Sequence, residues 1–430
     1  MPNGTLPISL NLDIRGIGHS PTLAINERSA ALQAEGRQIH RLGLGQSPFP
    51  VPEPVVEALR RHAGEKDYLP VMGLPALRRA VADYHFRKEG VRADPNDVLI
   101  GPGSKELMFL AQLCYYGDLV VPTPCWVSYA PQARMLGRKV RLLPTNFAHR
   151  WRLSSQQLEA LCEEDPDRPR LVILNYPGNP EGSTYRKSRL QDLARVARRY
   201  KVILLSDEIY GPLRFDGEHQ SVARYYPEGT IVSGGLSKWC GAGGWRLGTF
   251  IFPESLRWLR DAMSAAASET YTSVSAPIQH AAITAFEGCA EIDDYLVHAR
   301  RILSALGHRC TAKLREVGAH MVEPQGGFYV FPDFTALAPR LAARGIRTSV
   351  DLCTGLLEEA GVAVLPGTAF NRDPLELTFR IAYVNFNGAA ALQASRETSP
   401  NLPLDEAWLR ARCPETLAAI DRIAAWMNGG

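Results

Sequence analysis

The stretch Gly234–Gly248 places one lysine, Lys238, among small and apolar residues, and one arginine, Arg246, follows within the same stretch. Apolar surroundings lower the pKa of a lysine, and its neutral amine can then form a Schiff base with a carbonyl compound. The planar fork of an arginine suits a phosphate group, and glycines let the backbone approach a ligand closely. Taken alone, the pair also fits a surface loop with two solvated charges.

Further polar or aromatic residues follow two apolar runs of strand length. Ser104 and Lys105 come shortly after Val98–Ile100, at the expected start of a helix. The backbone N–H groups there could face a phosphate, although an ordinary helix N-cap is the simpler interpretation. Trp126 follows Leu119–Val121 and could stack on an aromatic ring. A tryptophan of the protein core explains it equally well.

The next two strand-like runs are followed by Asn179 and by Asp207 with Tyr210. The amide of Asn179 can donate to a phenolate oxygen, while an Asx turn is the structural alternative. Asp207 stands at the end of its strand, where a carboxylate needs a cation or must cap a helix. A protonated pyridine nitrogen would serve as that cation and would make the ring an electron sink. Tyr210 could reach the same ring oxygen as Asn179.

Ligands of open parallel sheets bind at the carboxyl ends of the strands, so these motifs are expected to lie together. In chain order they would supply a phosphate cradle, a stacking ring, an oxygen donor, a nitrogen partner and a Schiff-base lysine. Five unrelated loops are not expected to imitate that set. The combination predicts a site for pyridoxal 5'-phosphate (PLP).

The elements that would carry these residues alternate along the chain. Continuous apolar strands separated by amphipathic helices indicate an α/β fold with a mostly parallel, seven-stranded sheet covered on both faces. A long helix is expected over Ile292–Val317, and a smaller α+β domain is expected from both ends of the chain. The polar segment Ala394–Pro403 is expected to be a surface loop. The predicted large domain spans residues 50–300, and the small domain spans 1–49 and 301–430. The expected strands are Val98–Ile100, Leu119–Val121, Val140–Leu143, Leu171–Leu174, Val202–Leu205, Ile231–Val232 and Leu247–Ile251.

Length and composition limit the possible functions. The 430 residues exceed the roughly 250–300 at which a single core stops growing, which favours two domains. A net charge of +3 does not argue for a nucleic-acid or membrane partner, and no apolar run approaches about 20 residues. The eight cysteines form no CxxC pair, and the ten histidines show no metal-binding spacing. The N-terminal residues lack a secretion-signal pattern, so we expect a cytoplasmic protein. From the histidine spacing we expect no metal site.

The ordered motifs resemble the fold-type-I PLP enzymes, specifically the class I/II aminotransferases, from about Ile25 to Met427. NYPGNPEG, SDEIY and LSKWCGAGGWRLG are similar to the family's NPxNPTG, DExY and SKxxxxxGxRxG motifs. PQGGFYVFPDF and FRIAYV resemble motifs of its small domain. The resemblance implies that Lys238 binds PLP covalently and that Asp207 pairs with the pyridine nitrogen.

The remaining site residues follow from the same resemblance. Asn179 and Tyr210 would contact the phenolic oxygen of PLP, and Trp126 would stack on its ring. Arg380 would clamp the α-carboxylate of an amino acid, with help from Gly45 and Asn179. Tyr68 would reach the phosphate bound by a neighbouring subunit, which implies a homodimer with shared sites. The phosphate contacts within one chain would be Ser104, Lys105, Ser237 and Arg246.

Three departures from the family pattern qualify the resemblance. Gly235 stands where a serine often contacts the phosphate, and Glu181 stands where threonine is common. The stretch Ala267–Pro277 lacks the second arginine that dicarboxylate-binding members carry. The expected substrate is therefore a neutral, aliphatic or aromatic amino acid, used with a 2-oxo acid in ping-pong transamination.

Two other functions fit the same motifs. A PLP-dependent C–S lyase or an aminocyclopropane-carboxylate-synthase-like enzyme would share every cofactor contact. A regulator that senses PLP or an amino acid would carry an additional DNA-binding module. The roughly 25 residues before the resemblance show no helix-turn-helix pattern, which disfavours the regulator.

Overall fold

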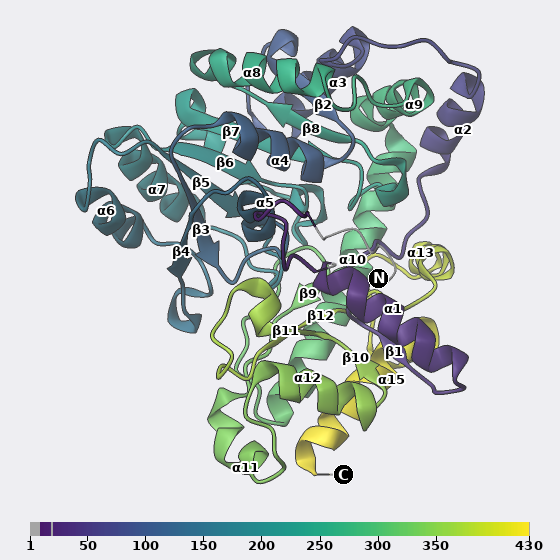
Figure 1. Cartoon of the computed structure of the whole chain (residues 1–430). Coiled ribbons are helices and arrows are strands. Elements are labelled where there is room, and N and C mark those ends of the chain that lie inside the picture. The colour runs from purple at the N-terminus through teal and green to yellow at the C-terminus, as the bar shows by residue number, and fades with distance from the viewer. Residues whose placement is uncertain (1–8, 19, 430) are drawn as a thin grey trace, which may run out of the picture.

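The computed structural model describes residues 9–18 and 20–429 of the chain. Figure 1 shows a large sheet between helices and, beneath it, a smaller group of helices and short strands. The N-terminal helix and the C-terminal helix both lie in the smaller group. The predicted α/β architecture is confirmed, while the exact domain boundaries stay a prediction. Residues 1–8, 19 and 430 of the predicted small domain lie outside the described residues.

The large sheet has seven strands in the order β2-β8-β7-β6-β5-β3-β4. Its strands pair in parallel except for β8, which is antiparallel to both of its neighbours. All seven strands predicted from apolar runs are present, with ends shifted by at most three residues. They are β2 (Val98–Gly101), β3 (Asp118–Thr123), β4 (Val140–Pro144), β5 (Arg170–Asn175), β6 (Ile203–Asp207), β7 (Thr230–Gly235) and β8 (Gly248–Ile251).

Alternate residues of the central strands pack into different hydrophobic clusters on the two faces of the sheet. On β5, Leu171 and Ile173 join the cluster beneath α4 and α8, whereas Val172 and Leu174 join the cluster beneath α6 and α7. Each fully buried aliphatic side chain contributes about 1.5–3 kcal/mol, so burial on both faces fixes the strand register. The helices around this sheet are α2 (Glu53–His62), α3 (Pro75–Glu89), α4 (Ser104–Cys114), α5 (Tyr129–Met135), α6 (Ser155–Glu163), α7 (Lys187–Arg199), α8 (Arg257–Ser268) and α9 (Ala276–Glu287).

The smaller part is built around α10 (Ala290–Glu316) and two short sheets. In one sheet, β1 (His40–Arg41) pairs in parallel with β10 (Val362–Ala363), which joins the two ends of the chain. The other sheet is antiparallel, with β12 (Phe379–Ala382) between β11 (Leu365–Pro366) and β9 (Tyr329–Val330). The helices packed around them are α1 (Pro21–Ala34), α11 (Ala338–Ala342), α12 (Ser349–Glu358), α13 (Gly388–Glu397), α14 (Glu406–Arg412) and α15 (Pro414–Asn428).

One local expectation from the sequence is wrong. The polar segment Ala394–Pro403 reads as a surface loop, but its first four residues end helix α13. The Asn387 side chain caps this helix by accepting from the Ala390 amide at 3.1 Å. Ala394 and Ser395 are buried, and the Ser395 hydroxyl contacts the ring of His298. Tertiary packing therefore holds a helical turn that polarity alone does not indicate.

Glycines allow close packing at the carboxyl end of β7. Gly235 lies opposite Gly248 of β8 and has a φ of +147°. A Cβ at Gly235 would lie 2.6 Å from the carbonyl oxygen of Leu247. A Cβ at Gly248 would overlap the backbone nitrogen of Ser104, where α4 begins. A side chain at Gly235 would therefore have to displace the backbone that leads into β8.

We predict that Gly235→Ser lowers the free energy of unfolding by about 2 kcal/mol or more, because the new Cβ meets backbone rather than a flexible side chain. Gly244→Ser is the matched control, since no heavy atom lies within 4 Å of a Cβ built there. Denaturant unfolding of the two variants and the parent protein measures the difference. Equal stabilities of the two variants would contradict the prediction.

Candidate active site

A cavity of about 600 Å³ opens at the carboxyl edge of the large sheet and is closed from the other side by the smaller part. Except for Tyr68, which is 90% exposed and does not line this cavity, every site residue predicted from the sequence lies on its wall. These residues are Gly45, Ser104, Lys105, Trp126, Asn179, Asp207, Tyr210, Ser237, Lys238, Arg246 and Arg380. The structure thus brings together groups that the sequence separates by more than 300 positions.

Lys238 stands three residues beyond the end of β7 and reaches into the cavity. Its Nζ donates a hydrogen bond to the carbonyl oxygen of Gly45 at 2.8 Å. Burial, aided by the positive charge of Arg380, lowers the pKa of Lys238 to about 8. An appreciable fraction of this amine is therefore neutral and nucleophilic near neutral pH.

Asp207 ends β6, and its carboxylate is buried. The hydroxyl of Tyr129 donates to one carboxylate oxygen, and that of Ser233 donates to the other at 3.4 Å. Burial raises the pKa of Asp207 to about 6, because these hydrogen bonds only partly compensate for lost hydration. No lysine, arginine or histidine among the described residues forms an ion pair with it. The carboxylate can therefore accept a cationic ligand group.

Two residues beside Asp207 were not singled out from the sequence. Tyr129 lies three positions after Trp126 and binds Asp207 directly. Asn175 ends β5, where its amide donates to the Asp207 carbonyl at 2.9 Å and its oxygen accepts from the Asn179 amide at 2.8 Å. Asn175 could have been identified from the sequence by its position at the end of a strand, since the same position identified Asp207.

Trp126 forms an aromatic wall of the cavity. Its ring packs edge-on against Tyr129, with centroids 5.2 Å apart and planes at 79°. The ammonium of Lys105 lies 5.2 Å from the centroid of Trp126. Burial and the nearby Arg246 lower the pKa of Lys105. A planar ligand ring placed here would lie between an aromatic face and the polar groups of the strand ends.

The end of the cavity nearest α4 is suited to an anion. Helix α4 begins at Ser104 after Gly103, which has a φ of +87° and provides no side-chain cap. The guanidinium of Arg246 packs against Gly103, so closely that a Cβ there would overlap it. Free N–H groups at a helix N-terminus, together with an arginine and Lys105, form a favourable phosphate environment. Ser237 adds a hydroxyl on the same wall.

Arg380, on β12, is almost completely buried. One Nη donates to the Asn179 side-chain oxygen at 3.0 Å and the other donates to the Gly43 carbonyl. Its Nε has no hydrogen-bond partner among the described residues. The guanidinium also lies 4.6 Å from the ring centroid of Tyr329. Arg380 is therefore an enclosed cation that faces the cavity without a counterion, as carboxylate binding requires.

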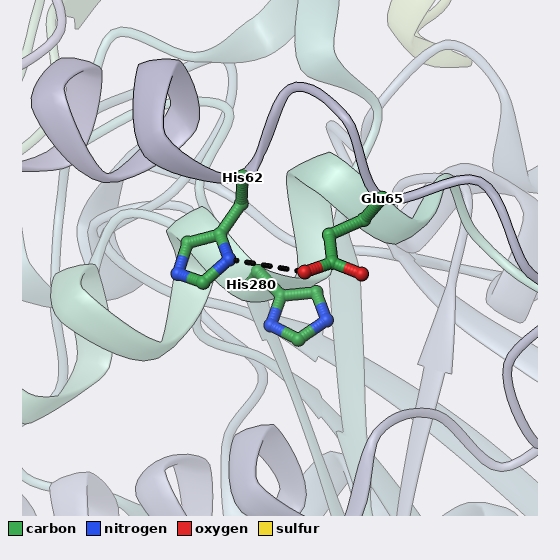
Figure 2. Close-up of side chains that lie close together, drawn as sticks. All are labelled: His62, Glu65 and His280. Carbon is green, nitrogen blue, oxygen red and sulfur yellow. Dashed lines mark hydrogen bonds and ion pairs between the residues drawn. The ribbon is translucent and has the colours of Figure 1, made fainter.

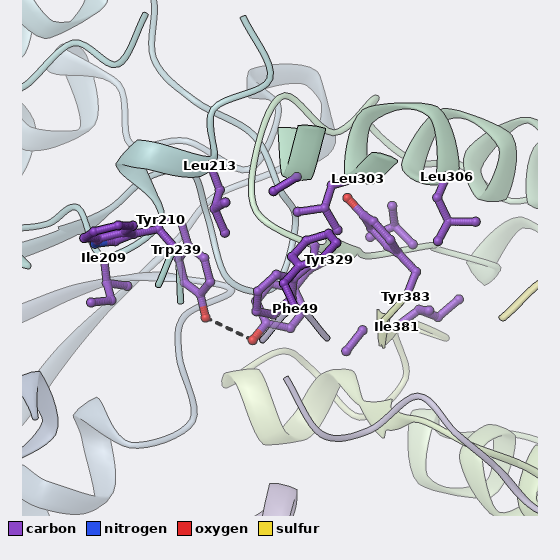
Figure 3. Close-up of a cluster of buried hydrophobic side chains, with 14 of the residues drawn as sticks. Phe49, Ile209, Tyr210, Leu213, Trp239, Leu303, Leu306, Tyr329, Ile381 and Tyr383 are labelled. Atoms are coloured by element: carbon purple, nitrogen blue, oxygen red, sulfur yellow. Dashed lines mark hydrogen bonds between the residues drawn. The ribbon is translucent and has the colours of Figure 1, made fainter. Parts of the chain in front are cut away.

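The Tyr210 hydroxyl forms a hydrogen bond of 3.0 Å with the Tyr329 hydroxyl. Figure 3 shows this pair, with Tyr210 and Tyr329 converging from the two parts of the chain. Both rings are buried, and burial raises the pKa of each hydroxyl. Both residues therefore present neutral hydroxyls to the cavity at physiological pH.

Chain folding also assembles histidine and glutamate groups that sequence spacing does not reveal. His62 and His280 stack with ring centroids 4.6 Å apart, and Glu65 accepts from His62 at 3.5 Å (Figure 2). A second, buried group joins Glu89, Glu208 and His219. Neither group lines the main cavity.

The comparisons with known proteins agree with this geometry. Residues 37–389 match the family described as Aminotransferase class I and II. The chain belongs to the class I and II aminotransferases. It is accordingly a transaminase. None of the helices within residues 9–18 and 20–429 is long and apolar enough to cross a membrane.

Individual relatives match this aminotransferase over most of its length. An aspartate aminotransferase of Bacillus sp. (strain YM-2) is 30% identical over 380 residues, which cover 86% of this chain and 93% of that protein. An asparagine–oxo-acid transaminase of Streptococcus mutans is 30% identical, with coverages of 82% and 89%. The crystal structure of the aspartate aminotransferase from Rhizobium meliloti superposes with a TM-score of 0.83 at 29% identity, covering 98% and 99% of the two chains.

The lowered pKa of Lys238 predicts a pH-dependent stability of the enzyme with no ligand bound. Between about pH 8 and 10.5 the unfolded chain keeps a proton that the folded Lys238 has lost, so stability rises with pH in this window. Relative to Lys238→Met, the free energy of unfolding of the parent enzyme should rise by about 1–2 kcal/mol between pH 7.5 and 9.5. Urea unfolding of both proteins across this range measures the difference, and a pH-independent difference would refute it.

Proposed function

We propose that the enzyme binds PLP through Lys238 and transfers an amino group from an L-amino acid to a 2-oxo acid by ping-pong transamination. The observation that carries this proposal is one cavity lined by a low-pKa lysine, an unpaired buried carboxylate and an unpaired buried arginine. When bound, PLP supplies an electron sink for the charge left when the substrate Cα loses its proton. The residues present match the aldehyde, ring nitrogen and phosphate of this cofactor.

Each wall of the cavity would hold a different part of PLP. Asp207 would pair with the pyridine nitrogen, whose positive charge would in turn lower the carboxylate pKa that burial now raises. Asn179 and Tyr210 would contact the phenolic oxygen, and Trp126 would stack on the ring. The phosphate would lie at the N-terminus of α4, bound by Ser104, Lys105, Ser237 and Arg246.

Substrate handling would fall to two residues on opposite sides of the cofactor. Arg380, which has no carboxylate partner among the described residues, would bind the amino acid carboxylate, with Asn179 and the Gly45 backbone beside it. Lys238, once its amine is free, would take the Cα proton and return it as general base and acid. Its lowered pKa suits it to move a proton in both directions near neutral pH.

Thr22, Leu23 and Leu44 line the cavity, and this side is called its mouth because Leu23 is 52% exposed. The substrate side chain would extend towards the mouth. This partly apolar mouth, and the lack of arginine in Ala267–Pro277, support a neutral, aliphatic or aromatic amino acid. The aspartate aminotransferases among the relatives favour a second candidate, an acidic amino acid. Lys105 would then be the cation for the side-chain carboxylate, in place of a contact to the phosphate.

We further propose a homodimer in which Tyr68 of each subunit reaches the phosphate bound by the other. The 90% exposure of Tyr68 within one chain supports this arrangement, because the ring is accessible to a second copy. A cytoplasmic location is supported by the eight cysteines, all of which are unpaired thiols.

The covalent role of Lys238 is tested by Lys238→Ala. We expect loss of the visible absorption of bound PLP and a fall in transamination of at least about 10²-fold, because the variant has no amine for attachment or proton transfer. Lys187→Ala, an exposed lysine on α7, is the control and should behave as the parent enzyme. A visible band that survived in Lys238→Ala would refute the assignment. Pyruvate and ammonia released without any oxo-acid acceptor would identify a lyase instead.

The side-chain preference is tested by half-reactions of the PLP enzyme with leucine, phenylalanine and aspartate. We expect leucine or phenylalanine to have the highest kcat/KM, by about 10-fold or more over aspartate, because no cation is reserved for a second carboxylate. Lys105→Met should then weaken PLP binding without changing the ranking. A preference for aspartate that Lys105→Met abolishes would instead support the acidic substrate.

A further inference from the structure

Tyr329 of β9 contacts three members of the site, although no role has so far been given to it. It is 1% exposed, and its ring belongs to the hydrophobic core between the two parts of the chain. Figure 3 places it within that cluster, with its hydroxyl directed at the hydroxyl of Tyr210. It also lines the cavity itself. A phenylalanine would fill the same core position, so the hydroxyl needs an explanation of its own.

The hydroxyl of Tyr329 is satisfied by one side chain. Within residues 9–18 and 20–429, its hydrogen bond is the one of 3.0 Å to Tyr210. A phenol has a single proton to donate. When Tyr210 donates its proton to a phenolic oxygen in the cavity, Tyr329 must therefore be the donor to Tyr210. The hydrogen bond that Tyr329 donates to Tyr210 polarises the Tyr210 hydroxyl. It thereby strengthens the hydrogen bond that Tyr210 donates to the phenolic oxygen.

The ring of Tyr329 touches the two other groups. A Cβ at Gly45 would overlap the Tyr329 hydroxyl, so this backbone rests directly on the tyrosine. The carbonyl of the same Gly45 accepts the amine of Lys238. On the other side, the Arg380 guanidinium lies 4.6 Å from the ring centroid, within cation–π distance. One side chain thus supports Tyr210, the Gly45 backbone and Arg380 together.

We propose that Tyr329 is a positioning residue for the transaminase reaction, with separable roles for its hydroxyl and its ring. The hydroxyl orients the proton of Tyr210 towards the phenolic oxygen of the cofactor. The ring holds Arg380 in place for the substrate carboxylate. This assignment rests on the proposed function, because it acts through Tyr210 and Arg380.

Tyr329→Phe removes the hydroxyl and keeps the ring. Without the donor behind it, Tyr210 stabilises the phenolate form of bound PLP less well. The pH titration of the visible absorption should therefore shift upward by about 0.3–1 pH unit, and kcat should fall about 2–10-fold with KM nearly unchanged. Tyr329→Leu also removes the ring beneath Arg380, so KM for the amino acid should rise at least a further 3-fold.

Tyr383→Phe is the matched control. Tyr383 is buried in the same cluster (Figure 3), but its hydroxyl donates to the Gly327 carbonyl at 3.4 Å and it does not line the cavity. Its titration and kcat should equal those of the parent enzyme. In a double-mutant cycle, Tyr329→Phe should add little once Tyr210 is phenylalanine, because both substitutions break the same hydrogen bond.

The outcomes separate this inference from the proposed function. If the parent enzyme with PLP shows no visible absorption, the proposed function itself fails. If the parent absorbs and titrates but Tyr329→Phe titrates at the same pH, the role of the hydroxyl is refuted. If KM of Tyr329→Leu equals that of Tyr329→Phe, the support of Arg380 is refuted. Urea unfolding of each variant confirms that it is folded before these comparisons are made.

Discussion

Three ionisable side chains, Lys238, Asp207 and Arg380, surround one cavity without forming ion pairs within the described chain. Removing a charge from water without a partner is unfavourable by several kcal/mol. The unfavourable desolvation shows in the lowered pKa of the two cations and the raised pKa of the carboxylate. Hydrophobic packing in the rest of the fold must offset this unfavourable free energy. The packing involves both faces of the large sheet and the long helix α10.

The topology explains why these charges meet. Parallel strands end at one edge of the large sheet, so residues following β2, β3, β5, β6 and β7 converge although the chain separates them widely. The smaller part then closes the cavity with β9 and β12, which carry Tyr329 and Arg380. Neither part alone encloses the site. The glycines at Gly235 and Gly248 let β8 and α4 approach the strand ends closely enough to complete it.

Much of this site could be predicted from sequence because many of its residues lie at, or within a few residues of, the ends of apolar strands. Asp207 and Lys238 are examples, since a strand end fixes where such a side chain lies. Tyr329 could not be found in that way, because its contact with Tyr210, 119 positions earlier in the chain, depends on how β9 packs. The prediction for Tyr68 is not tested by the fold of one chain, because its predicted contact would be in a second chain. The α13 turn at Ala394 was missed because burial, not polarity, decides its conformation.

The residues at the mouth of the cavity come from a different stretch of chain than those at its floor. Thr22, Leu23 and Leu44 belong to the N-terminal segment, whereas Asp207 and Lys238 follow core strands. None of these three N-terminal side chains belongs to a hydrophobic cluster of the described residues, so they can change without disturbing the packing that sets the strand ends. If the proposed site is right, this separation would let a lineage change its substrate preference by a few substitutions near the mouth and keep the residues at the strand ends unchanged.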